Sequence, residues 1–347
     1  MRASFPVAIC CLFSAFGRAE PPPINIYMWE DSLSPHVAHK WQTLNNQEIK
    51  ISNFDNDDER NLLMMNSPQL PFDIIVLDNI SAKLYGDLGA FDDLSTLQNT
   101  QNNAPKWNQA CGRYAIPYFW GNVGITYRKD RISNPPQTWA EFLSPAPELR
   151  GHVGMITDTV ETLLPALSSL GLSPITDNAN DLHQAYSTMQ AALPNIASFE
   201  YILSYVRSHA DVEDISIAMA YSGDNYALNR YMDKPIWGYV VPKGEPYIWV
   251  DCMAINKHSK NKQQAKALLE YLSTPQVAAE NAQYVRAATP NLSALKLMPD
   301  WYLNDSTLFP EQILTGHGLI DTGLSANNIN LRAKIIHKLL KDHETQH

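Results

Sequence analysis

The alternation of apolar and polar positions predicts strands separated by helices along most of the chain. Residues 24–29 alternate as a first strand, and residues 35–46 then place Val37, Trp41 and Leu44 at helical spacing. Later strands are predicted at residues 49–54, 72–77, 114–121, 123–127, 153–156, 215–221, 236–241 and 246–255. Further helices are predicted at residues 59–66, 163–170, 181–193, 199–209, 260–272, 275–284 and 325–341. This order predicts an α/β class with mostly parallel sheets.

The predicted strand at residues 246–255 carries a carboxylate inside an aromatic and β-branched run. Trp249 and Asp251 are two positions apart, so both side chains leave the same face of a strand. An indole beside a carboxylate forms a seat for an organic cation, because the ring face attracts the charge and the carboxylate accepts its N–H bonds. The alternative is a core tryptophan next to an aspartate that caps a turn.

Other acids follow predicted strands or begin predicted helices. They are Glu30 and Asp31 after Trp29, Asp78 after the apolar run at 72–77, and Asp158 with Glu161 after the strand at 153–156. Ligands of open α/β sheets bind at the carboxyl ends of strands. Because these acids come from distant parts of the chain, they favour a cleft between two lobes. A helix N-cap is the alternative for each acid.

Composition narrows the class of protein and of ligand. A chain of 347 residues is too long for one ordinary core, so two domains are expected. The formal net charge of −10 argues against a nucleic-acid partner and is compatible with a cationic ligand.

The N-terminus has the pattern of a secretory signal. Arg2 precedes an apolar run at residues 3–16, and Gly17 and Ala19 are small residues that suit cleavage near Ala19. The run is too short for a stable membrane-spanning helix, and no other stretch could cross a bilayer. We therefore expect residues 1–19 to be removed from a protein exported to the periplasm, without stable membrane insertion. Cys10 follows no small residue, which argues against a lipoprotein.

Two cysteines remain after the predicted cleavage, Cys111 and Cys252. An oxidising compartment permits them to pair, but sequence does not show whether their Cα atoms come close enough. We leave the disulfide open and slightly favour free buried thiols.

Taken together, these segments resemble the bacterial periplasmic solute-binding proteins of the spermidine/putrescine family, the receptor components of polyamine ABC importers. The resemblance covers about residues 24–341 and is specific through the order and spacing of its motifs. These are Tyr27-Met28-Trp29, Phe72-Asp73-Ile74-Ile75-Val76, Ile116-Pro117-Tyr118-Phe119-Trp120-Gly121, Thr138-Trp139-Ala140-Glu141, Thr157-Asp158 with Glu161, Trp249-Val250-Asp251, and Thr289-Pro290-Asn291-Leu292.

The resemblance implies a type II periplasmic-binding-protein-like fold whose two lobes close on an extended polyamine. Residues 24–127 with about 252–300 would form lobe 1, and residues 128–251 with about 301–345 would form lobe 2. It implies a membrane ABC permease as partner, no cofactor or metal, and a monomer. The residues that match the family's ligand positions are Trp29, Asp31, Asp158, Glu161, Trp249 and Asp251.

Several positions depart from the family pattern. Ser32 and Ile80 stand where aromatic residues are expected, and Leu319 where a glutamine is common. Tyr221 takes the place of an expected tryptophan, and Asp78 that of a small hydroxyl residue. With the additional acid Glu30, the predicted pocket contains up to six carboxylates: Glu30, Asp31, Asp78, Asp158, Glu161 and Asp251.

Three classes of function compete for these residues. The leading hypothesis is a non-catalytic receptor that binds a polyamine and delivers it to a permease. A secreted hydrolase would use Asp158 and Glu161 as an acid/base pair, but the chain lacks a G-x-S-x-G elbow and an H-E-x-x-H helix. A receptor for another organic cation or for a metal such as Ca²⁺ would also suit clustered carboxylates. The neighbouring tryptophans argue against the metal, because a hard cation gains little from an aromatic wall.

Overall fold

The computed structural model describes residues 21–54, 57–66, 70–209 and 214–346. The expected signal segment, residues 1–19, and its cleavage point near Ala19 lie outside these residues. In the described ranges, no helix is both long and apolar enough to cross a membrane.

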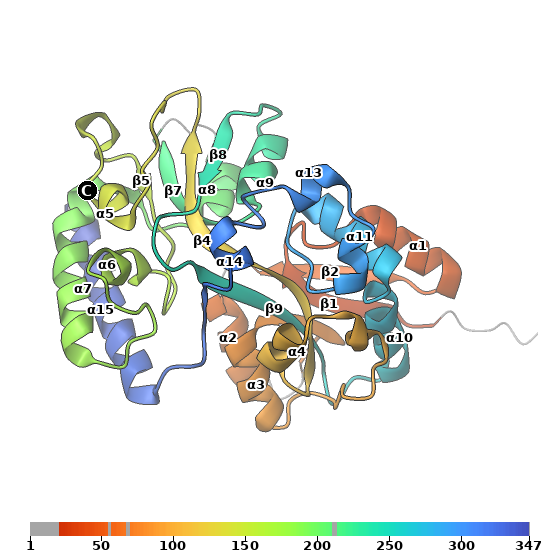
Figure 1. The fold of residues 1–347 in the computed structure, drawn as a ribbon. Coiled ribbons are helices and arrows are strands. Elements are labelled where there is room, and N and C mark those ends of the chain that lie inside the picture. Colours follow the sequence, from red (N-terminus) through yellow and green to blue (C-terminus); the bar gives the residue numbers. More distant parts are fainter. Residues whose placement is uncertain (1–20, 55–56, 67–69, 210–213, 347) are drawn as a thin grey trace, which may run out of the picture.

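The strands form one mixed sheet that runs across the molecule (Figure 1). Its main path runs β2-β1-β3-β9-β4-β7-β5-β6, while β10 pairs with β9 and β8 with β4. The strands are β1 (Ile24–Trp29), β2 (Ile49–Phe54), β3 (Ile74–Asp78), β4 (Ala115–Arg128), β5 (Val153–Gly154), β6 (Ile196–Ser198), β7 (Ile217–Tyr221), β8 (Trp237–Val240), β9 (Tyr247–Ile255) and β10 (Leu319–Ile320). Parallel pairings outnumber antiparallel ones among the described strands, and each antiparallel pairing involves β4 or β9.

Helices gather in two groups around this sheet (Figure 1). One group packs α5, α6, α7 and α15 together, and the other contains α1, α10, α11 and α12. The helices are α1 (Pro35–Asn45), α2 (Asp57–Asn66), α3 (Asn79–Asp87), α4 (Pro105–Cys111), α5 (Trp139–Leu143), α6 (Leu164–Ser169), α7 (Ala179–Ala192), α8 (Ile202–Ser208), α9 (Asp224–Tyr231), α10 (Lys262–Leu272), α11 (Pro275–Val285), α12 (Leu292–Leu295), α13 (Asp300–Leu303), α14 (Glu311–Leu314) and α15 (Ala326–Glu344).

The long strands β4 and β9 stand in the middle of the sheet and connect its two ends. The first part of β4 pairs with β9, and its second part, from Val123 onward, pairs with β7 and β8. Likewise, β9 pairs with β10 at Tyr247 and Ile248 and with β3 from Asp251 onward. Both strands therefore pass through the junction where Trp249 and Asp251 lie.

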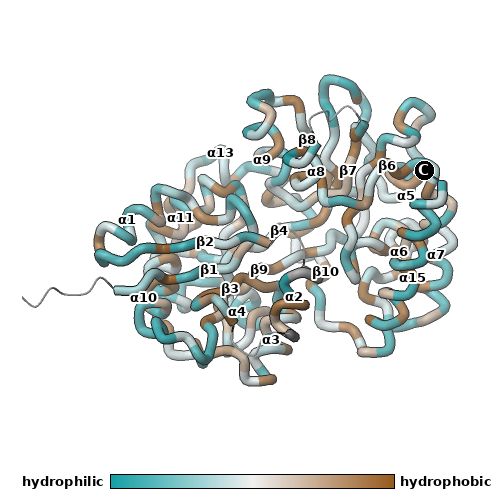
Figure 2. The backbone as a smooth tube through the Cα atoms, turned by 180° about the vertical axis from the view of Figure 1, so that it is seen from behind, coloured by the Kyte–Doolittle hydropathy of each residue, from teal (hydrophilic) through white to brown (hydrophobic). Residues whose placement is uncertain are grey.

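Two large hydrophobic cores lie on either side of this junction. The first contains Ile26, Ile75 and Met253, and it extends to Ile313. Figure 2 shows β3 in the brown of apolar residues, as expected for a strand inside this core. The second is built on α6, α7 and the outer part of β4, and a smaller third cluster packs α8 and α9 against β7 and β8. Below, "first half" means the part built on the first core, and "second half" the part built on the other two. The division into lobes that move as units remains a prediction.

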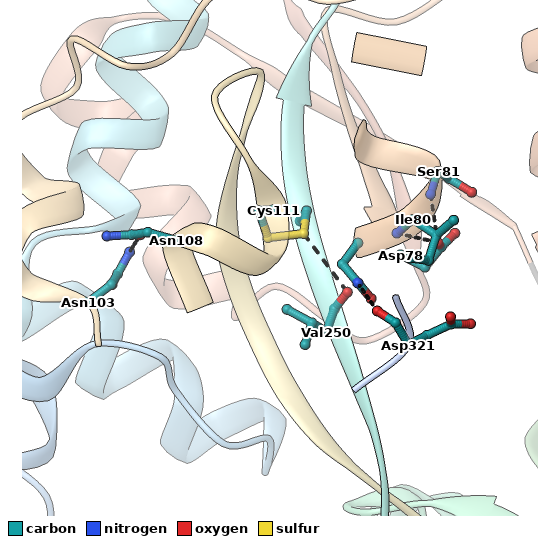
Figure 3. Close-up of a disulfide and its surroundings, with 10 residues drawn as sticks. Asp78, Ile80, Ser81, Asn103, Asn108, Cys111, Val250 and Asp321 are labelled. Carbon is teal, nitrogen blue, oxygen red and sulfur yellow. Dashed lines mark hydrogen bonds between the residues drawn. A yellow bond between two sulfur atoms is a disulfide. The ribbon is translucent and has the colours of Figure 1, made fainter. Parts of the chain in front are cut away.

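The preference for free thiols was wrong, because Cys111 and Cys252 form a disulfide (Figure 3). Cys111 ends α4 and Cys252 lies on β9, and their Cα atoms are 5.6 Å apart, inside the range that a disulfide can span. Both residues are fully buried in the first core. Their sequence separation of 141 explains why no local pattern could show this proximity.

Most predicted elements are confirmed, and a few differ from the structure. β1 and β2 begin and end at the predicted residues, whereas the predicted strand at 153–156 is only Val153–Gly154. No helix was predicted at Asn79–Asp87, where α3 forms. Its N-terminus is fixed by Asp78, the acid for which an N-cap was the alternative interpretation.

Candidate ligand-binding cleft

One cavity of about 470 Å³ lies at the junction of the two halves. Its walls come from the carboxyl ends of β1, β3 and β7, from β9, and from the turn before α6. All nine residues predicted for the ligand site line it: Trp29, Glu30, Asp31, Asp78, Asp158, Glu161, Tyr221, Trp249 and Asp251. The structure therefore brings the predicted set together, while the role of each residue in binding stays a prediction.

The Trp249 side chain packs against both large cores. Its indole Nε1–H donates to the Asn122 carbonyl at 3.3 Å, so its polar edge is bonded to β4. Gly121 permits this approach, because a Cβ at that position would lie 2.4 Å from Trp249 Cζ2. The indole packs with its ring centroid 6.2 Å from that of Tyr221. In the first half, Trp29 lies 4.5 Å from Phe54 between ring centroids, which adds a second aromatic wall.

Asp251 is the carboxylate that leaves the same face of β9 as Trp249. Both side chains are partly exposed and line the cavity, while Val250 between them is buried. Burial raises the pKa of Asp251 to about 7, although the charge of Arg60 and a hydrogen bond from Trp29 act in the opposite direction. A carboxylate with so high a pKa gains strongly from a cation placed against it. The alternative interpretation, an aspartate that caps a turn, is wrong, because Asp251 lies within β9.

Asp158 and Glu161 reach the cavity from the turn that leads into α6. They were expected at the start of a helix, but α6 begins only at Leu164. Asp158 Oδ1 accepts from the Val160 N–H at 2.9 Å, and the Thr162 hydroxyl is 2.8 Å from the Asp158 N–H, so the turn is held internally. Glu161 is almost fully buried. This turn places acids of the second half opposite those of the first.

Asp78 is both a helix cap and a salt-bridge partner. Its Oδ1 accepts from the N–H groups of Ile80 and Ser81 at 2.9 and 2.8 Å (Figure 3). Its Oδ2 lies 2.6 Å from Nη2 of Arg60, whose side chain is fully buried. Asp78 also stands opposite Asp251 in the β3–β9 register. The N-cap interpretation is thus confirmed for Asp78, and both of its oxygens have partners in the protein.

Glu30 and Asp31 contact residues of the second half. Glu30 forms an ion pair with Arg207 on α8. Asp31 accepts from the Tyr231 hydroxyl at 2.6 Å, and its Oδ2 is 4.0 Å from Arg230. The backbone of Asp31 is left-handed, with φ at 56°, which turns the chain immediately after β1. These two acids therefore already have cationic or hydroxyl partners.

Sequence reasoning missed two further acids of the cavity, Asp224 and Asp321. Asp224, in the first turn of α9, accepts from the Tyr221 N–H at 2.7 Å, and burial raises its pKa to about 7. Its position just after β7 is the signal that identified Asp78, so it could have been found. Asp321 is 3.3 Å from the Tyr247 hydroxyl, and burial raises its pKa as well. It follows the two-residue strand β10, which gives no such signal.

The positions that depart from the family pattern have different surroundings. Ser32 is buried, and its hydroxyl donates to the Trp29 carbonyl at 2.5 Å. Ile80 lines the cavity. Leu319 pairs with Tyr247 in the sheet and is not among the described residues that line the cavity.

The model of the family described as bacterial extracellular solute-binding protein matches residues 37–310. The protein belongs to this family.

Curated relatives of this solute-binding protein include receptors named for polyamines. It is 50% identical over 330 residues to the norspermidine sensor of Vibrio cholerae, a match that covers 95% of this chain and 92% of the relative. It is 27% identical over 314 residues to the spermidine/putrescine-binding periplasmic protein of Escherichia coli, with 88% of each chain covered. The relatives are binding proteins and a sensor, and this chain is a binding protein rather than an enzyme.

Solved structures agree with the two-lobed fold. A spermidine/putrescine transporter substrate-binding protein from Streptococcus pneumoniae superposes with a TM-score of 0.76 at 22% identity, covering 93% of this chain and 100% of the other. A protein from Listeria monocytogenes, described as a spermidine/putrescine transporter, gives a TM-score of 0.79 at 23% identity, covering 92% and 99%. At these identities the likeness concerns the fold. Over the described residues, no group of three or more His, Cys, Asp or Glu side chains could hold a metal ion.

Proposed function

We propose that this solute-binding protein captures a polyamine in the cleft between its two halves. The observation that carries the proposal is the placement of Trp249 and Asp251 in one cavity with Asp158, Glu161 and Asp224 of the second half. A polyamine carries several ammonium groups joined by methylene chains. Acids can accept the N–H bonds of each ammonium, and aromatic faces can cover the methylenes, with cation–π contact adding about 0.5–2 kcal/mol per site.

Each residue has a proposed role. Asp251 and Asp224 receive ammonium groups of the ligand, and Asp158 with Glu161 receive another. Trp29, Tyr221 and Trp249 form the walls around the chain. Glu30, Asp31 and Asp78 belong to the same cavity and add negative potential, although each has a partner within the protein.

A triamine is the proposed preferred ligand. The relative at 50% identity is named a norspermidine sensor, whereas the relatives named for spermidine or putrescine are about half as similar. The same comparison favours a sensory receptor as a second candidate role beside delivery to an ABC permease. In both roles the protein acts in the periplasm, as a monomer released from its signal segment near Ala19, and closure of the two halves around the ligand is the signal to the membrane partner.

Calorimetry on the mature chain tests this function. We expect binding heat with norspermidine and spermidine, weaker binding with putrescine, and none with lysine or Ca²⁺. Transport and sensing are then separated by whether the loaded protein pulls down a permease or a membrane receptor from solubilised membranes. Absence of heat with every polyamine, from protein that unfolds cooperatively, would contradict the proposal.

A further inference from the structure

Four partly exposed side chains from the two halves meet along one rim of the cavity. Glu30 and Asp31 follow β1, whereas Arg207 lies on α8 and Tyr231 ends α9. All four line the cavity, and we call them the rim cluster.

The contacts within the rim cluster cross from one half to the other. Glu30 pairs with Arg207, and the Tyr231 hydroxyl donates to Asp31 at 2.6 Å across a sequence separation of 200. The Arg207 guanidinium carbon is 5.8 Å from the centroid of the Tyr231 ring, so the two contacts adjoin. Separation of the halves along this rim would therefore break both contacts.

The rim cluster is distinct from the cores that hold each half folded. The relative exposure of the side chains is 24% for Arg207 and 44% for Glu30. α8 and α9 are instead anchored by buried Ile202 and Leu228 in the third core. Loss of a rim contact should therefore affect the relation between the halves more than the folding of either.

We propose that Arg207 and Tyr231 are positioning residues that act through Glu30 and Asp31 to keep the halves together and so slow ligand release. The part of this inference that concerns the ligand rests on the proposed function.

The inference predicts that removing the Arg207 charge weakens ligand binding, whereas simple electrostatics predicts that it strengthens binding. Arg207 is a cation in a cavity proposed to bind cations, so removing its charge alone should tighten binding. A closing contact predicts the reverse, because the closed state loses a stabilising interaction that the open state does not make.

Two measurements on R207Q, Y231F and the double variant test the inference. Small-angle X-ray scattering of the ligand-free protein should give a larger radius of gyration for the double variant than for wild type. Stopped-flow binding of norspermidine should show dissociation about 3-fold faster in each single variant and about 10-fold faster in the double variant, with little change in association. The charge swap E30R/R207E should recover most of the slow dissociation, because it restores the ion pair in the opposite sense.

Matched controls remove similar interactions that stay within one half. R113Q deletes the surface pair of Arg113 with Asp93 in the first half, and Y186F deletes the 3.2 Å hydrogen bond from Tyr186 to Asp342 in the second. Neither Arg113 nor Tyr186 lines the cavity, and both variants should behave as wild type.

The possible outcomes separate this inference from the proposed function. Wild-type scattering and unchanged or slower release in the double variant would overturn the role of the rim cluster. Should wild type bind no polyamine, the proposed function fails, and the scattering comparison alone still decides whether these contacts hold the halves together.

Discussion

Five acids of the cleft fall into two groups that differ in their partners. Glu30, Asp31 and Asp78 each have a side-chain oxygen within 4.0 Å of an arginine nitrogen of the protein. Asp224 and Asp251 instead accept only neutral donors and form no ion pair within the described residues, and burial raises the pKa of each to about 7. The carboxylates of this cluster are therefore not equivalent. The first group organises the protein, while the second has the properties of a seat for an external cation.

The largest expected effect is the loss of binding in D251N. The substitution removes the negative charge that faces a desolvated ammonium, so norspermidine affinity should fall by about 100-fold, and at least 10-fold. Calorimetry gives the affinity. The ligand-free variant should also unfold at a slightly higher temperature than wild type at pH 8. Because the pKa of Asp251 is raised to about 7 in the folded protein, wild type loses stability as pH rises from the unfolded-state pKa of Asp through about 7. The variant should not show this loss, because Asn has no charge to bury. Unchanged affinity would remove Asp251 from the site.

The next largest effect is expected from the aromatic wall. W249A should weaken norspermidine binding by about 10-fold through lost cation–π and methylene contacts. W249F should recover part of this loss. Trp301 is 45% exposed and lies outside the cavity lining, so W301A is a matched control and should bind as wild type does. A W249A protein that fails to fold, while W249F binds as tightly as W301A, would favour a core role for Trp249.

The pH dependence of affinity should report on Asp224 and Asp251. Asp224 and Asp251 are partly protonated near pH 7 and must ionise to accept an ammonium, so polyamine binding should release protons. Affinity should therefore fall as pH drops below about 7, by at most about 10-fold per pH unit for each proton released. Calorimetry in buffers of different ionisation enthalpy counts the protons. Affinity that is constant between pH 5.5 and pH 8 would show that neither acid faces the ligand.

The smallest effect on binding is expected from the first group. D78N should leave norspermidine affinity within about 3-fold of wild type. It should nevertheless lower the free energy of unfolding by about 1–3 kcal/mol, because it removes the charge beside the fully buried Arg60 and weakens the cap of α3. Urea denaturation measures the stability. A large loss of affinity at unchanged stability would place Asp78 in the second group.

The sequence predicted much of the fold and most of the cleft for identifiable reasons. The run at Ile74–Asp78 and the Trp249–Asp251 pair are local patterns, and their strand periodicity fixed which side chains share a face. The partners of the acids could not be predicted in the same way. Asp31 and Tyr231 are separated by 200 residues, and Cys111 and Cys252 by 141. Such contacts depend on how β4 and β9 bring the two halves together, which no local pattern encodes.

A crystal structure with norspermidine bound would show which acids receive the ammonium groups. We predict that ammonium nitrogens lie about 2.7–3.2 Å from carboxylate oxygens of Asp251 and Asp224, with the methylene chain against Trp249. The Arg60–Asp78 pair should stay intact. Ammonium groups bound instead to Glu30, Asp31 or Asp78, with Asp251 and Asp224 out of contact with the ligand, would contradict these roles.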